Sequence, residues 1–308
     1  MSPVVLGTGV VGLLFFILAL VVSRKDVTAA RGLDKLIALA FVFYAAPLAA
    51  FGAEHLTDAQ DIMQLIPSWM PARLFWAYFV GVALIAAALS LSLKKYVRLS
   101  APLLALMFFL FVAMMHIPGV IGNPHDRFSL AVAFRDLSFG SGALALTGAL
   151  MQRTSAGDKN LAITIARVFI GSTMILYSVE HVLHPAFVVG LPLQKTTPAW
   201  MPLPHVWAYV TAAILFVAGV ALVINRYARN AALWSGLWIM LVTFCFYGPI
   251  LAVAKGAGEL IVGLNYVYDT MLFGGTILLL AGALSAWFPG IVEGTDRRAV
   301  PYGERVEV

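Results

Sequence analysis

Five ionisable side chains that could carry chemistry lie at or inside the ends of apolar segments. Glu54 and His55 end one segment, His116 lies near the end of another, and Arg135-Asp136 lie within a third. Charged groups inside a bilayer are costly, and by default they indicate a functional site in which each has a partner. Histidine titrates near neutral pH and burial raises the pKa of a carboxyl group. We therefore predict a proton-linked or quinone-linked catalytic site at these five residues.

A second set of residues repeats part of this pattern later in the chain. Glu180-His181 end another apolar segment, and Asp269 lies within the last one. Tyr247 occupies the position that corresponds to His116, so the two sets are not chemically equivalent. A cofactor, for which quinone is the candidate, is predicted to contact five side chains of the repeated pattern: Trp69, Trp76, Glu180, His181 and Asp269.

Other interpretations of the first set remain open. Carboxylates and imidazoles together suit zinc or iron, but adjacent Glu54 and His55 diverge by about 100° on a helix, so no metal is assigned. A purely structural role is also consistent with the sequence: Asp136 pairs with Arg135 or His55 to hold the helices together, while Glu54 and His55 face water at the interface. Binding of another ligand or of a protein partner is a further alternative.

The elements that must position these residues are membrane-spanning helices. The chain is 61% hydrophobic and only 11% charged, whereas soluble domains carry about 25% charged residues. A spanning helix needs roughly 20 apolar residues, and the runs are continuous rather than alternating, which argues against a β-barrel. We predict an all-α polytopic membrane bundle of nine helices, at about 3–22, 33–53, 73–93, 99–118, 129–150, 161–183, 205–224, 231–251 and 266–288.

The basic residues predict the orientation of these helices. With the N-terminus outside, the cytoplasmic segments hold fourteen Lys and Arg residues and the outer loops hold four, in agreement with the positive-inside rule. We expect a bacterial-type inner membrane, a cytoplasmic C-terminus and the lipid bilayer as the surrounding partner. The dispersed positive charge gives no indication of nucleic-acid binding.

A repeated loop indicates that the chain contains a tandem duplication. Pro67–Pro71 reads Pro-Ser-Trp-Met-Pro and Pro198–Pro202 reads Pro-Ala-Trp-Met-Pro, and each precedes a Trp-Ala-Tyr helix start. Self-similarity in this order indicates duplicated units, and four spans per unit give both copies the same orientation. The predicted divisions are an N-terminal anchor helix and cytoplasmic loop (1–32), a first four-helix unit (33–152), a second unit (160–288) and a cytoplasmic tail (289–308).

The ordered motifs of both units resemble the DoxX family of four-helix membrane proteins. The motifs are Gly52-Ala53-Glu54-His55, Trp69-Met70-Pro71, Trp76-Ala77-Tyr78 and Arg135–Gly140, with Glu180-His181, Trp200-Met201-Pro202, Trp207-Ala208-Tyr209 and Asp269 in the second copy. The resemblance implies a four-helix fold for each unit. Its members include a subunit of a thiosulfate:quinone oxidoreductase, membrane partners of oxidoreductases, and receptor-assembly chaperones.

Together these features predict a redox-linked, quinone-associated membrane subunit. The single cysteine, Cys245, allows no disulfide or CxxC redox motif within the chain, so a membrane or periplasmic redox partner subunit must supply any redox centre. The alternative is a non-catalytic ligand-binding, assembly or transport protein.

Overall fold

The protein is an all-α membrane bundle. The computed structural model describes residues 2–152, 160–198, 200–285, 288 and 291, and in this part of the chain the only β-type pairing is a single bridge between Phe187 and Thr196. Eight helical segments there are long and apolar enough to cross a membrane. The predicted fold class is therefore confirmed.

One of the nine expected spans, residues 129–150, is not among those eight. It lies in a helix of comparable length, α8 (Arg127–Gln152). Its apolar sequence is interrupted by Arg135-Asp136 and by serine and glycine residues. The predicted linker at 153–159 and most of the predicted tail at 289–308 lie outside the described residues.

The first part of the chain forms ten elements, of which η2 is a π-helix: α1 (Pro3–Ala29), α2 (Asp34–Ala38), α3 (Ala40–Thr57), α4 (Ala59–Ile62), η1 (Met63–Leu65), α5 (Arg73–Leu93), α6 (Val97–Phe111), η2 (Val112–His116), α7 (Ile117–Gly122) and α8 (Arg127–Gln152). The second part forms six, of which η3 is again a π-helix: α9 (Leu161–Leu183), α10 (Pro204–Val223), α11 (Ala228–Val242), η3 (Thr243–Tyr247), α12 (Gly248–Val253) and α13 (Ala257–Leu284).

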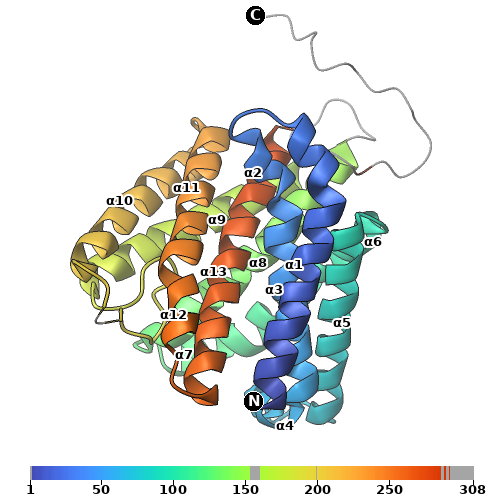
Figure 1. The fold of residues 1–308 in the computed structure, drawn as a ribbon, viewed down its shortest axis with the longest axis vertical. Coiled ribbons are helices and arrows are strands. Elements are labelled where there is room, and N and C mark those ends of the chain that lie inside the picture. Colours follow the sequence, from blue (N-terminus) through green and yellow to red (C-terminus); the bar gives the residue numbers. More distant parts are fainter. Residues whose placement is uncertain (1, 153–159, 199, 286–287, 289–290, 292–308) are drawn as a thin grey trace, which may run out of the picture.

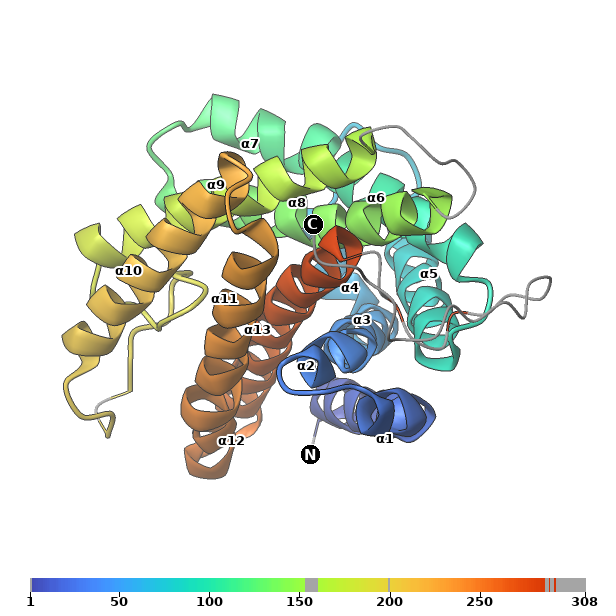
Figure 2. The same cartoon turned by 90° about the horizontal axis from the view of Figure 1, so that it is seen from above.

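Helices α3 and α13 form the centre of the bundle. In the apolar stretches of these two spans 83% and 94% of the residues are buried, compared with 17–50% in the other six. Figures 1 and 2 show α13 between α11 and α3, with α1 packed on the outer side of α3. Polar groups placed on α13 are therefore enclosed by protein rather than by lipid.

Glycine allows these central helices to approach closely. A Cβ atom built on Gly275 of α13 would lie 2.8 Å from the backbone carbon of Phe43 and the backbone nitrogen of Tyr44 in α3. Small residues permit such backbone contact between membrane helices. The Tyr44 hydroxyl then donates a 2.7 Å hydrogen bond to the Phe139 carbonyl of α8, so α3, α8 and α13 are joined at one level.

The two parts of the chain share several local features. Helix pairs α3–α5 and α9–α10 match one another, and the pairs α8–α9 and α13–α3 join the two parts. Each part has a five-residue π-helix followed by a short helix with proline at its second position. The indole nitrogens of Trp76 and Trp207 each donate a 3.1 Å hydrogen bond to the carbonyl of the proline five residues earlier.

Candidate functional site

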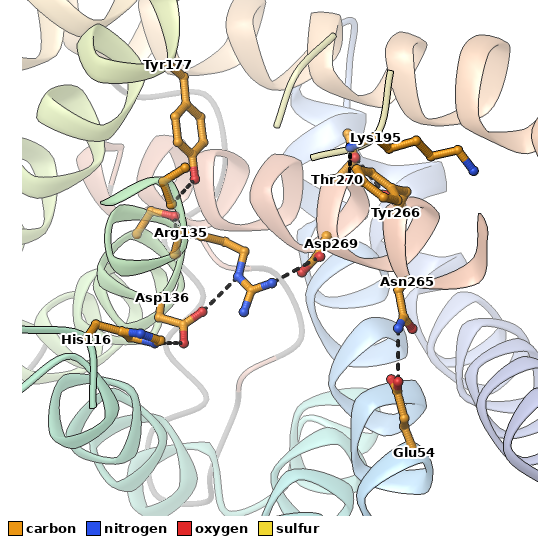
Figure 3. A network of polar contacts seen from close by, with 12 residues as sticks. Glu54, His116, Arg135, Asp136, Tyr177, Lys195, Asn265, Tyr266, Asp269 and Thr270 are labelled. Carbon is orange, nitrogen blue, oxygen red and sulfur yellow. Dashed lines mark hydrogen bonds and ion pairs between the residues drawn. The ribbon is translucent and has the colours of Figure 1, made fainter. Parts of the chain in front are cut away.

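A chain of polar contacts connects α6–α7, α8 and α13 (Figure 3). His116 Nε2 lies 2.8 Å from Asp136 Oδ2, Asp136 Oδ1 accepts a 2.9 Å hydrogen bond from Arg135 Nε, and another Arg135 nitrogen donates to Asp269 Oδ2 at 3.2 Å. The two aspartates are only 8% exposed as side chains, and Arg135 is 24% exposed. The guanidinium therefore links two buried carboxylates that belong to different predicted units.

Local backbone structure accounts for how these groups meet. His116 is the last residue of π-helix η2, and a π-turn widens the helix by one residue and is frequent at functional sites.

Asp126 precedes α8, where its carboxylate accepts hydrogen bonds from the Phe128 amide, at 3.1 Å, and from the Ser129 hydroxyl. The Ser129 hydrogen bond lowers the pKa of Asp126, and the negative charge suits the start of a helix.

Glu54 joins α13 one turn away from this chain of contacts. Its Oε1 accepts a 2.9 Å hydrogen bond from the Asn265 side-chain amide, and Asn265 lies four residues before Asp269 on the same helix, which places both on one face. The Oδ1 atom of Asn265 is buried and has no hydrogen-bond partner among the described residues. Glu54 is thus held beside the cluster, not inside it.

His55 lies apart from the cluster, although the sequence placed it in the same set. Its Nδ1 is 2.8 Å from the Phe51 carbonyl in its own helix, so Nδ1 carries the proton. No contact joins His55 to His116 or Asp136 in the part of the chain that the structure describes. Of the two partners that the structural interpretation offered for Asp136, Arg135 makes the contact and His55 does not.

The corresponding residues of the second part hold an outer loop. Glu180 accepts a 2.9 Å hydrogen bond from Arg127, which also donates to the Pro192 and Leu193 carbonyls, both at 2.6 Å. His181 is 1% exposed; its Nδ1–H donates to the Tyr177 carbonyl, and its Nε2 accepts from the Gly190 amide, both at 2.8 Å. Glu180 therefore holds the loop through Arg127, and His181 holds its backbone directly.

This loop enters the bundle without forming a helix. Val188, Val189 and Leu191 are at most 2% exposed, and the hydroxyl of Tyr247 donates a 2.6 Å hydrogen bond to the Val189 carbonyl. Non-helical backbone is tolerated at membrane depth only where protein satisfies its polar groups. Tyr247, the counterpart of His116, thus serves to anchor the loop.

A cavity of about 440 Å³ opens where the loop meets α8 and α13. Its lining combines one carboxylate, one ammonium and two amides with aromatic and aliphatic side chains: Phe128, Leu193, Gln194, Lys195, Val262, Asn265, Tyr266 and Asp269. This volume falls within the roughly 300–1,000 Å³ of small-molecule sites, which pair apolar walls with a few polar groups. Asp269 thus connects the buried polar contacts to a space that a ligand can enter.

The two charged groups of the cavity lining, Asp269 and Lys195, both have hydrogen-bonding capacity to spare. Asp269 Oδ2 is bonded to Arg135, whereas Oδ1 has no hydrogen bond to any described residue. The Lys195 ammonium lies 5.7 Å from the centre of the Tyr266 ring and has no ion pair within 4 Å among the described residues. Lys195 is in the loop outside the spans, and burial lowers its pKa.

Arg135 separates two groups of ionisable side chains, His116 with Asp136 on one side and Asp269 on the other. A guanidinium stays protonated in proteins, so it cannot relay a proton between Asp136 and Asp269. Asp269, on the cavity side, is the group able to exchange a proton with a ligand, while His116 and Asp136 hold Arg135 in place from the other side. The described residues contain no group of three or more His, Cys, Asp or Glu side chains arranged to hold a metal ion.

The two tryptophans assigned to a cofactor lie away from this cavity. Trp69 is 65% exposed in a turn, and the ring of Trp76 packs against Phe75 and Phe79. Tryptophan side chains in such positions are typical of a membrane boundary.

Four residues of the site were not singled out from the sequence: Arg127, Lys195, Asn265 and Tyr266. The Asn265–Asp269 spacing was the one available signal, since two polar side chains four apart in an apolar span share a face.

The fold and the buried cluster define the class: a polytopic helical membrane protein with ionisable groups enclosed between its helices. Residues 162–248 match the DoxX family model, so the resemblance to DoxX-like membrane proteins is confirmed. Residues 44–121 match a family described as a domain of unknown function, DUF8561. No curated protein and no solved structure matches the chain.

The two matched regions cover corresponding helices, α3–α7 and α9–α11 with η3. Helices α8 and α13, which carry Arg135, Asp136 and Asp269, lie outside both.

Proposed function

We propose that this protein is a redox-linked membrane subunit that binds a quinone. The ligand would occupy the cavity between α8, α13 and the loop that follows α9. The observation that supports this most is the position of Asp269: a buried carboxylate, bonded to Arg135 through Oδ2 and without a hydrogen bond to a described residue at Oδ1, lines a cavity that has aromatic side chains in its wall. Quinone chemistry couples electron transfer to proton transfer, and such a ligand needs a proton-exchanging group beside an apolar space. A resident carboxylate meets that need.

The residues have distinct roles in this proposal. Asp269 exchanges the proton with the ligand, and Arg135 fixes the carboxylate. Asp136 and His116 are positioning residues because they act through Arg135 and do not line the cavity. Asn265 forms part of the wall and is oriented by Glu54.

Electrons must enter from elsewhere. The one cysteine, Cys245, offers no redox pair, so we propose a membrane or periplasmic partner subunit that carries the redox centre. The positive-inside pattern supports an inner-membrane location with the cavity on the outer side, where such a partner would dock.

Quinone binding to the purified protein tests the proposal. The protein is extracted gently, and bound lipids, quinones and subunits are identified by native mass spectrometry. Short-chain ubiquinone is then titrated against wild type and Asp269→Asn, with Tyr268→Phe as the matched control, because Tyr268 is the neighbouring residue and its hydroxyl points to the Gly9 carbonyl of α1, 3.4 Å away.

We expect saturable binding in wild type and Tyr268→Phe, and at least tenfold weaker binding in Asp269→Asn. No quinone binding by wild type, or equal binding by Asp269→Asn, contradicts the proposal. A stable partner or a different small molecule in place of quinone favours the assembly, ligand-binding or transport alternative.

A further inference from the structure

The two charged groups of the cavity lining, Asp269 and Lys195, have opposite hydrogen-bonding roles. Asp269 lies within the bundle and provides an oxygen that only accepts. Lys195 extends from the loop and provides nitrogen-bound protons that only donate. Figure 3 shows the Lys195 side chain directed away from Asp269, so the two groups address different parts of a ligand. Their chemistry specifies what such a ligand must offer at each position.

The carboxylate distinguishes the two redox forms of a quinone. Arg135 already uses Oδ2, at 3.2 Å, and holds the carboxylate in a fixed orientation. An oxidised ring presents carbonyl oxygens, which bring acceptor against acceptor at Oδ1. A reduced ring presents hydroxyl groups, which donate to it, and hydrogen bonds to a charged acceptor are roughly twice as strong as neutral ones.

We infer that the cavity prefers the hydroxyl-bearing, reduced form of its ring ligand over the carbonyl-bearing, oxidised form, with Asp269 as the residue that selects it. The inference rests on the proposed function and adds the redox form of the bound ligand. Only binding is claimed, so no electron acceptor is required.

Lys195 has a different part in recognition. A carbonyl oxygen and a hydroxyl oxygen both accept from an ammonium, so Lys195 strengthens binding of both forms alike. The Lys195 backbone is fixed in place, because its amide donates a 2.7 Å hydrogen bond to the Tyr266 hydroxyl. Phe128 and Tyr266 add aromatic surface to the lining, against which either ring form can pack.

The selectivity follows from the value of one charged hydrogen bond. Hydrogen bonds to charged groups contribute about 1.5–3 kcal/mol, and each 1.4 kcal/mol is tenfold in affinity. The reduced form should therefore bind roughly 10- to 100-fold more tightly than the oxidised form.

The test uses full-length protein in lipid nanodiscs at pH 8, without oxygen. Three probes are titrated: short-chain ubiquinone, the corresponding ubiquinol kept reduced, and the dimethyl ether of that ubiquinol, which retains the ring but has no donor. Wild type is compared with Asp269→Asn, Lys195→Met and Tyr268→Phe. Tyr268 neighbours Asp269 on α13 but does not line the cavity, and the fold of each variant is checked by its unfolding transition.

We expect ubiquinol to bind most tightly to wild type, with the dimethyl ether no tighter than ubiquinone. Asp269→Asn should bring the two redox forms within about threefold of each other, because an amide both donates and accepts. Lys195→Met should weaken both forms by a similar factor, and Tyr268→Phe should preserve the preference.

Equal or reversed preference in wild type overturns the inference and leaves the proposed function standing. A preference that survives in a folded Asp269→Asn variant also overturns it. Absence of binding by all three probes overturns the proposed function itself.

Discussion

Arg135 is the residue whose loss should destabilise the protein most clearly. Arg135→Met leaves two buried carboxylates without their guanidinium. Asp136 keeps His116 at 2.8 Å, but Asp269 has no other ion-pair partner among the described residues. Removing one member of a buried pair costs about 3–5 kcal/mol. Because Arg135 is 24% exposed, we expect about 3 kcal/mol.

The same asymmetry predicts which second change restores stability. Asp269→Asn, added to Arg135→Met, removes the unpaired charge and should recover more than half of the lost unfolding free energy. Asp136→Asn, added instead, should recover less, because Asp136 retains His116. The unfolding free energy is measured by equilibrium unfolding in mixed micelles of dodecyl maltoside and sodium dodecyl sulfate, followed by circular dichroism.

The reasoning is refuted if Arg135→Met unfolds within 1 kcal/mol of wild type. It is also refuted if the Asp136→Asn double variant recovers as much stability as the Asp269→Asn double variant. The first result would mean that the charges are solvated and not enclosed, and the second that His116 does not compensate for the loss of Arg135 at Asp136.

Three further predictions concern packing, the loop and the cavity lysine. Gly275→Ala should destabilise the protein by about 1–3 kcal/mol, because its Cβ would meet backbone atoms of α3 at 2.8 Å. Gly119→Ala should not destabilise the protein, because nothing lies within 4 Å of the Cβ there. The same unfolding assay compares the two variants. Tyr247→Phe should increase hydrogen exchange in the 184–197 segment, since Val189 loses its 2.6 Å hydrogen bond; unchanged exchange would show that the loop is held by other contacts. Burial lowers the pKa of Lys195, so its charged form destabilises the folded state at neutral pH, and this effect disappears as pH rises through the folded pKa to the unfolded pKa. Lys195→Met should therefore unfold no more easily than wild type at pH 7 and show less gain in stability towards pH 10, and a marked loss at pH 7 would contradict this.

The architecture could be predicted from the sequence because it depends on long, local signals. Continuous apolar runs locate membrane helices whatever their partners are, and the repeated Pro-x-Trp-Met-Pro loop identifies corresponding segments. The predicted number of spans differs from the number of candidate spans in the structure at α8, because Arg135-Asp136 and the following small residues reduce the apolarity of this helix. A helix enclosed by others tolerates such residues, and enclosure is a tertiary property.

The site could be predicted only in part, for the same reason. Arg135, Asp136 and His116 were assigned together and do meet. Their link to Asp269 was missed, because the sequence placed the site within one four-helix unit, and the contact is made between the two parts.

His181 and Glu180 show a second limit of prediction from the sequence. Their pattern matches His55 and Glu54, but they hold the backbone of a loop whose path no periodicity reveals. Lys195 and Arg127 lie in or beside that loop, so their roles depend on where it enters the bundle. Residues of this kind become recognisable only when the path of the chain is known.

The position of Asp269 on the last helix bears on how the protein is made. Synthesis proceeds from the N-terminus, so α8 reaches the bilayer before α13 does. Arg135 enters beside Asp136, its neighbour in the same helix, and the two charges can neutralise one another from the start. Asp269 brings an additional negative charge that has no partner on α13. An arginine already in place offsets part of the cost of inserting that charge, so the order of synthesis matches the order in which the buried charges are paired.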